Sequence, residues 1–174
     1  MDILEYKQKY FDNNICPPGE HHFVAVYLLN KFKRIPDYIN PDGMKGKCGD
    51  VIFENKDKSF CIEVKIGKTS FSFSKSENNS WFVYKKSTFP SYLIALTNNY
   101  LFIIKWNDFS DVFIRLKNPQ IINSKSGNSR RISEKELKDN LKNDSVFDLN
   151  SPNVENEIEK KFKTINKEIE NVYK

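Results

Sequence analysis

The sequence predicts a mixed α/β fold: a mixed β-sheet flanked by helices, with a helical C-terminal extension. Three observations lead to this class. Short apolar runs between polar turns predict strands near residues 49–65 and 91–106. An apolar run at residues 20–34 predicts a helix buried against that sheet. At 174 residues the chain has the length of one ordinary domain, and we place the core at residues 1–132 and the extension at residues 133–174.

Two helices are predicted before the first strands. Residues 2–14 favour a short amphipathic helix, and residues 20–34 favour a second one that is apolar nearly all round. Glu20 stands in the first turn of the second helix, on the same side as Phe23 and Tyr27. An acid at that position either complements the helix dipole or supplies a carboxylate to a functional site.

The most informative stretch is a predicted β-hairpin with its turn at residues 55–58. Both arms carry β-branched or aromatic residues, and the intervening polar residues favour a reversal. If Asn55 faces Lys58, then Val51 faces Ile62 and Asp50 faces Glu63. Side chains alternate along a strand, so one face carries Val51, Phe53, Phe60, Ile62 and Val64, and the other carries Asp50, Ile52, Cys61, Glu63 and Lys65.

The second face of this hairpin brings two carboxylates together. Directly opposed acids repel one another unless a positive charge offsets them. A divalent cation would do so, since carboxylate oxygens, water and phosphate are the ligands that Mg²⁺ takes. Lys65 lies on the same face, two residues from Glu63. The alternative is a surface hairpin whose acids pair with lysines.

Further strands are predicted after this hairpin. Residues 67–74 alternate like a strand, and any following helix is short and lies within residues 75–88. Residues 91–96 and 100–106 have the composition of central strands joined by a turn. We predict one more strand near residues 112–116.

The C-terminal region is predicted to be helical. Ser133 and Glu136 fit a capping box. A last helix starts near Ser151 and carries one apolar stripe, Val154, Ile158, Phe162, Ile165, Ile169 and Val172. This stripe either packs on the protein's own sheet or contacts a partner, including a second copy of the chain.

The charge distribution favours polyanionic partners. The chain carries +5, but residues 133–174 hold eight Lys and ten Asp or Glu, which leaves +7 for residues 1–132. Two basic loops, at residues 43–47 and 123–131, are either phosphate contacts or solvated surface. The candidate nucleic-acid contacts are Lys45, Lys47, Lys68, Lys125, Arg130 and Arg131.

Cysteine spacing and hydropathy bear on location. Cys16, Cys48 and Cys61 show no CxxC pair, which argues against a zinc site and a disulfide framework. The N-terminus lacks the apolar segment of a signal peptide, and no run of about 18 apolar residues is present. We therefore expect a soluble protein in a reducing, cytoplasmic compartment.

The hairpin carries a family resemblance. Gly49-Asp50, then twelve residues, then Glu63-Val64-Lys65, with Glu20 on an upstream helix, resembles the PD-(D/E)xK nuclease superfamily, the restriction-endonuclease-like fold that includes Holliday junction resolvases. Other Glu-x-Lys triplets occur in the chain, but only this one lies on an apolar strand paired to a strand that begins with Asp. The chain departs from the family in having Gly49 where the family has Pro, and in lacking a clear helix after Lys65.

The resemblance implies roles for these residues. Asp50, Glu63 and the backbone carbonyl of Val64 would bind Mg²⁺, for which Mn²⁺ can substitute. Lys65 would orient the attacking water or stabilise developing negative charge, and Glu20 would support the site. We therefore expect a metal-dependent endonuclease that acts on DNA rather than RNA. The alternatives are a non-catalytic nucleic-acid-binding module of the same fold, or an interaction protein that regulates a nuclease complex through the C-terminal stripe.

Overall fold

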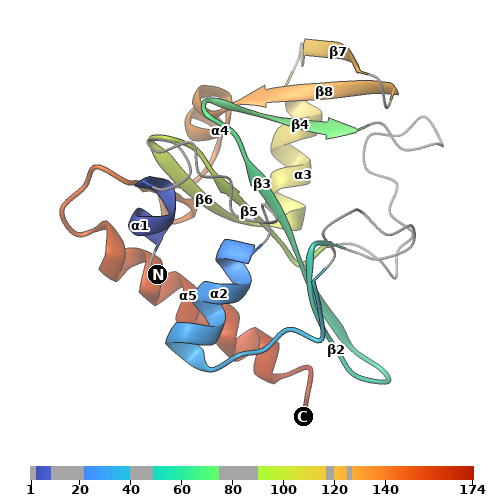
Figure 1. Ribbon diagram of the computed structural model, residues 1–174. Coiled ribbons are helices and arrows are strands. Elements are labelled where there is room, and N and C mark those ends of the chain that lie inside the picture. The colour runs from blue at the N-terminus through green and yellow to red at the C-terminus, as the bar shows by residue number, and fades with distance from the viewer. Residues whose placement is uncertain (1–2, 9–21, 40–48, 75–89, 117–119, 125–126) are drawn as a thin grey trace.

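The computed structural model describes residues 3–8, 22–39, 49–74, 90–116, 120–124 and 127–174. Over these residues the predicted α/β class is confirmed. A mixed six-stranded sheet and a smaller three-stranded sheet are flanked by helices, and a long helix stands near the C-terminus (Figure 1). The narrower designation, a restriction-endonuclease-like fold, stays a prediction.

The large sheet has the strand order β1-β2-β3-β5-β6-β9. Its third and fourth strands run parallel, and the other neighbours are antiparallel. The strands are β1 Tyr38–Ile39, β2 Val51–Glu54, β3 Ser59–Ile66, β5 Tyr92–Leu96, β6 Tyr100–Lys105 and β9 Val146–Asp148. The predicted hairpin and the predicted strand pair after residue 90 are thus confirmed.

The small sheet has the order β4-β8-β7, with β4 at Ser70–Ser74, β8 at Gly127–Ser133 and β7 at Gln120–Ser124. The chain reaches it through a tight turn at Gly67, where a Cβ atom would lie 2.0 Å from the Ser70 carbonyl oxygen. Alternation had predicted β4. The prediction of a basic loop at residues 123–131 was wrong, because much of it forms strands that pair with β4 and with each other.

Both faces of the large sheet are covered, one by helices alone and the other by helices together with the small sheet. On one face, α1 (Ile3–Lys7), α2 (His22–Phe32) and α5 (Val154–Glu170) contribute to the main core. On the other, α3 (Trp106–Arg115), α4 (Glu134–Asn140) and the small sheet enclose a second core. Of the helices described, none combines the length and apolar character needed to cross a membrane.

The prediction of a strand near residues 112–116 was wrong. This segment belongs to α3, in which Trp106, Phe109, Val112 and Phe113 are all buried. Their spacings of three and four residues place them on one side of a helix. The helical periodicity begins at Trp106, upstream of the β-branched and aromatic run that suggested a strand.

The capping box and the last helix predicted in the C-terminal region are confirmed, but the strand β9 at Val146–Asp148 was not predicted. The Ser133 hydroxyl accepts a hydrogen bond from the Glu136 N–H, and the Glu136 carboxylate accepts one from the Ser133 N–H at 2.7 Å, which completes the capping box. A 3₁₀ turn at Asn143–Ser145 follows and leads into β9. Every residue of the apolar stripe is buried in the main core, so the stripe packs on the protein's own sheet.

Candidate active site

The hairpin of β2 and β3 has the predicted register. The Asn55 N–H donates to the Lys58 carbonyl at 2.9 Å, and Val51 stands opposite Ile62. The two faces also separate as expected. One set of side chains enters the main core, namely Val51, Phe53, Phe60, Ile62 and Val64, whereas Ile52 and Cys61 pack together outside it.

Asp50 leaves the regular ladder. Its N–H donates to the Ile62 carbonyl at 2.9 Å, although Ile62 is the register partner of Val51. Two residues against one is the pattern of a β-bulge, which re-aims a side chain. The Asp50 carboxylate then accepts the Val64 N–H at 2.8 Å. The expected Asp50–Glu63 strand pair is therefore not formed, because the carboxylate of Asp50 takes the place of the next backbone acceptor.

Gly49 allows this close approach. A Cβ atom at Gly49 would lie 2.9 Å from the Ile62 carbonyl oxygen, nearer than a carbon atom normally comes. A proline at position 49 would have a Cβ atom and would make this unfavourably close contact. Glycine at position 49 therefore has a local steric reason.

Glu63 and Lys65 form an ion pair. They project from the same face of β3, and the Lys65 Nζ lies 2.5 Å from the Glu63 Oε1. Only 12% of the Glu63 side chain and 26% of the Lys65 side chain are exposed. The Lys65 Nζ also lies 5.7 Å from the centre of the Phe73 ring on β4. The lysine therefore stands between the two sheets.

The oxygen donors of this site suit a hard divalent cation. Asp50 is 7% exposed, and burying a carboxylate is costly unless it is paired. Since the N–H and C=O of a strand residue share one edge, the Val64 carbonyl leaves β3 on the edge where the Asp50 carboxylate lies. Two carboxylates and a carbonyl are ligands that Mg²⁺ or Mn²⁺ accepts, so the residues present fit the ion.

A complete ligand cluster is not seen within the described part of the chain. No group of three His, Cys, Asp or Glu side chains there is arranged to hold a metal. The third predicted acid, Glu20, lies outside the described residues. Its support of the site stays a prediction.

The predicted nucleic-acid contacts are only partly described. Lys68 is exposed in the turn between β3 and β4, and Arg131 is exposed on β8 opposite Ser72. Arg130 occupies the register position opposite Phe73. The other three candidates, Lys45, Lys47 and Lys125, lie outside the described residues.

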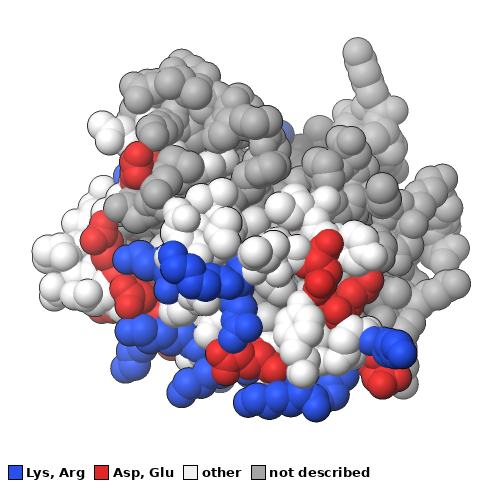
Figure 2. All heavy atoms as spheres, turned by 60° about the horizontal axis from the view of Figure 1, so that its bottom comes forward, with Lys and Arg blue, Asp and Glu red and all other residues white. Residues whose placement is uncertain are grey.

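Basic side chains elsewhere are mixed with acids. Figure 2 brings the lower part of the molecule forward and shows Lys and Arg interspersed with Asp and Glu. Ion pairs between basic and acidic side chains are present in the structure, as in Arg34 with Glu170 at 2.6 Å and Lys163 with Glu159 at 2.9 Å. This face has no single basic patch among the residues that are coloured, so it is a poor candidate for phosphate binding.

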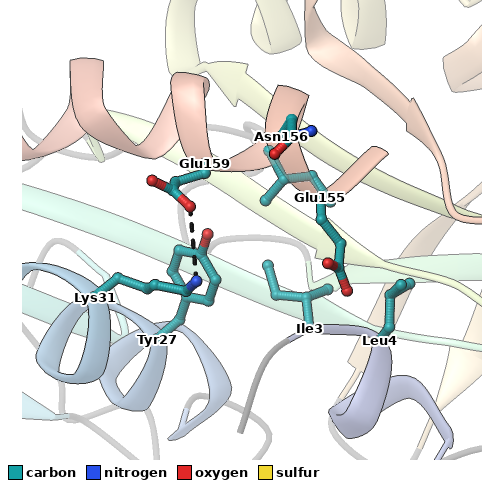
Figure 3. Close-up of a pocket in the computed structure, with 8 residues that line it drawn as sticks. Ile3, Leu4, Tyr27, Lys31, Glu155, Asn156 and Glu159 are labelled. Carbon is teal, nitrogen blue, oxygen red and sulfur yellow. Dashed lines mark ion pairs between the residues drawn. The ribbon is translucent and has the colours of Figure 1, made fainter. Parts of the chain in front are cut away.

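A small cavity lies apart from the candidate site. It has a volume of about 210 Å³ and lies among α1, α2 and α5 (Figure 3). Ile3, Tyr27 and Ile158 line it, and all three belong to the main core. An ion pair between Lys31 and Glu159, at 3.6 Å, spans its side. Glu63 and Lys65 project from the opposite face of the sheet, so this cavity is not part of their site.

Cys61 departs from the expectation drawn from cysteine spacing. It is buried and disulfide-bonded. The other two cysteines, Cys16 and Cys48, lie outside the described residues. The prediction of a reducing compartment rested on unpaired cysteines and loses that support.

Phe73 is a site residue that sequence reasoning missed. The alternation of β4 places Phe71 and Phe73 on one face and was a usable signal for a buried row. Nothing in the spacing indicated that this row would reach Lys65.

No protein-family model, curated protein or solved structure matches the chain.

Proposed function

We propose that this protein is a metal-dependent nuclease that hydrolyses phosphodiester bonds in nucleic acid, DNA rather than RNA. The observation that carries the proposal is the end of the β2–β3 hairpin. There the Asp50 carboxylate is fixed to the Val64 backbone, and the residues on either side of Val64 are an acid and a lysine in contact.

The acids and the carbonyl supply the ion's ligands in this proposal. Asp50, Glu63 and the Val64 carbonyl would hold Mg²⁺ or Mn²⁺, and Glu20 would assist as the family resemblance implies. When bound, such an ion polarises the phosphoryl oxygen and lowers the pKa of a coordinated water. The 2.8 Å bond from the Val64 N–H holds the Asp50 carboxylate in one orientation before any ligand arrives.

Lys65 supplies the positive charge of the site. Its ammonium is a compact cation with three N–H donors, and it is placed by Glu63 at 2.5 Å. A cation at that position offsets the negative charge that develops on the phosphoryl group or orients the attacking water. The charge of +7 on residues 1–132 is in keeping with a polyanionic substrate.

A cytoplasmic location and contact with a second copy or a protein partner belong to the same proposal. The apolar stripe of α5 is buried in the main core. Any partner contact of that helix would therefore use its polar side. Because the stripe is buried, it is also not available to a regulator that would act through it.

One observation favours a non-catalytic nucleic-acid-binding module instead. Glu63 is already paired with Lys65, and Asp50 already accepts a backbone N–H. The three side chains therefore have structural partners within the chain. A module that binds DNA without cutting it would show affinity but no metal-dependent turnover.

The test is cleavage of supercoiled, linear, branched and single-stranded DNA, and of RNA, with Mg²⁺ or Mn²⁺. We expect cutting by the wild type, and its loss in Asp50→Asn and Lys65→Met. Asp57→Asn changes an exposed acid in the β2–β3 turn and is the matched control. DNA binding without cutting by folded wild type would support the non-catalytic module, and equal activity in all four proteins would refute the assigned site.

A further inference from the structure

The Lys65 ammonium has contacts from both sheets. On the large sheet the Glu63 carboxylate lies 2.5 Å from it. On the small sheet the Phe73 ring centre lies 5.7 Å from it. Within about 6 Å of a ring centre, a cation is attracted by the negative face of the aromatic ring. The ammonium is therefore in contact with a carboxylate from the large sheet and with a ring from the small one.

The Phe73 ring is itself held in place. Only 6% of Phe73 is exposed. Its ring lies 5.1 Å from that of Phe109 and 5.6 Å from that of Phe113, both on α3. The backbone of Phe73 pairs with β8 in the middle of the small sheet. A ring packed in this way presents a fixed surface to the lysine.

A fixed surface matters because a lysine side chain is flexible. Its four-carbon stem has many rotamers, and a single ion pair does not select one of them strongly. The ring adds attraction and occupies space that the stem would otherwise enter. Loss of the ring would leave Glu63 in place but remove the contact that the small sheet makes with the ammonium.

We propose that Phe73 is the positioning residue for Lys65, so that the small sheet completes the active site on the large one. This inference rests on the proposed nuclease function. It assigns the small sheet a role in turnover, whereas packing alone would assign it a role only in stability.

The test compares three variants. Phe73→Leu should lower kcat about two- to thirtyfold, the range expected for a cation–π contact, with little change in KM. Phe73→Tyr keeps the ring and should retain most of the activity. Phe71→Leu is the matched control, because Phe71 lies on the same strand and row, is 2% exposed, and packs edge-on against Phe102 at 6.2 Å.

A second measurement does not depend on activity. The ε-CH₂ resonance of Lys65, assigned with Lys65→Arg in lysine-labelled protein, should shift in Phe73→Leu because the ring current is lost. It should stay in place in Phe71→Leu. Equal kcat losses in the two leucine variants, or an unchanged Lys65 resonance in Phe73→Leu, would overturn the inference. An inactive wild type in which the resonance still shifts would refute the nuclease function and leave the Phe73–Lys65 contact established.

Discussion

Asp50 shows how one side chain at a strand end serves two purposes. Its carboxylate replaces a backbone acceptor for the Val64 N–H, and it also brings a negative charge to the edge of β3. The hydrogen bond supports the fold, whereas the charge is what a cation would need. Because an amide oxygen can accept the same N–H, substitution separates the two purposes.

Asp50→Asn should therefore fold normally and lose its response to Mg²⁺. In the wild type, binding of Mg²⁺ to the folded state should raise Tm, and in Asp50→Asn that rise should vanish. Asp50→Ala should in addition cost about 1–3 kcal/mol of unfolding free energy, because the buried Val64 N–H loses its acceptor. Urea unfolding with and without MgCl₂ measures both effects. Equal stability of the Asn and Ala variants would show that the hydrogen bond contributes nothing.

At the scale of elements, the register of the small sheet separates two neighbouring arginines. Ile132 stands opposite Phe71 and Arg130 opposite Phe73, whereas Arg131 stands opposite Ser72. Phe71, Phe73 and Ile132 are buried and Arg131 is exposed. Arg130 therefore occupies the register position opposite the residue whose ring contacts Lys65. The two arginines should thus contribute differently to substrate binding.

Arg130→Ala should weaken DNA binding and reduce the salt dependence of log K by about 0.7–0.9, the value of one phosphate contact. Arg131→Ala should leave the affinity and its salt dependence nearly unchanged. It is the matched control, because it removes the same side chain from the next position of β8. Fluorescence anisotropy over a series of salt concentrations measures the two slopes, with Ca²⁺ in place of Mg²⁺ to prevent cutting. The reverse order of effects would place the substrate on the outer face of the small sheet.

Sequence patterns predicted the structure correctly where the two partners of a contact lie close together along the chain. The β2–β3 hairpin was predictable because its turn fixes the register within sixteen residues of chain, 50–65. The strands β7 and β8 were missed because Ser, Asn and Gly make up half of their residues, and because β8 pairs with the distant strand β4. The bulge at Asp50 was likewise beyond reach, since it depends on which carbonyl the Asp50 N–H finds. The placement of Glu63 and Lys65 on one face of β3 was predictable, and the contact of Lys65 with Phe73 on the second sheet was not.

At the scale of the whole molecule, the C-terminal segment completes the main core. β9 adds a sixth strand beside β6, and α5 buries its apolar stripe against the same face as α2. The Tyr27 and Phe162 rings, from α2 and α5, lie 4.5 Å apart. The prediction that residues 1–132 form the core can be tested by truncation. Because β9 and α5 contribute to the main core, we expect a chain cut after residue 132 to lose much of its stability.

Phe162→Ala should lower the unfolding free energy by about 3–5 kcal/mol, as removal of a fully buried aromatic ring does. Lys163→Ala is the control on the same helix, since it removes only an exposed ion pair with Glu159 and should cost less than about 1 kcal/mol. Chemical denaturation monitored by tryptophan fluorescence gives both values. An unchanged stability of Phe162→Ala would revive the view that the stripe serves a partner.

Tyr92 on β5 is hydrogen-bonded to Glu168 on α5, and it should make the unfolding free energy depend on pH. Burial, and then the hydrogen bond that its hydroxyl donates to Glu168 at 2.9 Å, raise the pKa of Tyr92 above its ordinary value of 10.0. Its contribution to stability is fully present below that value. As the pH rises beyond it, the unfolded chain loses the proton first, so folding becomes less favourable.

Tyr92→Phe should therefore flatten the fall in unfolding free energy between about pH 9 and pH 11. Tyr38→Phe, which changes an exposed tyrosine of β1, should leave the wild-type slope in place. Urea unfolding across this range measures the slopes. Identical slopes in the wild type and Tyr92→Phe would mean that the tyrosine ionises equally in both states.

The position of α5 has a consequence for synthesis of the chain. The hairpin with Asp50, Glu63 and Lys65 leaves the ribosome early, whereas the stripe that closes the main core ends at Val172. Because chains emerge N-terminus first, the hairpin of a nascent chain would lie beside an open apolar surface until α5 has been made. The main core would therefore close only after α5 has left the ribosome, long after the hairpin that it helps to cover has emerged.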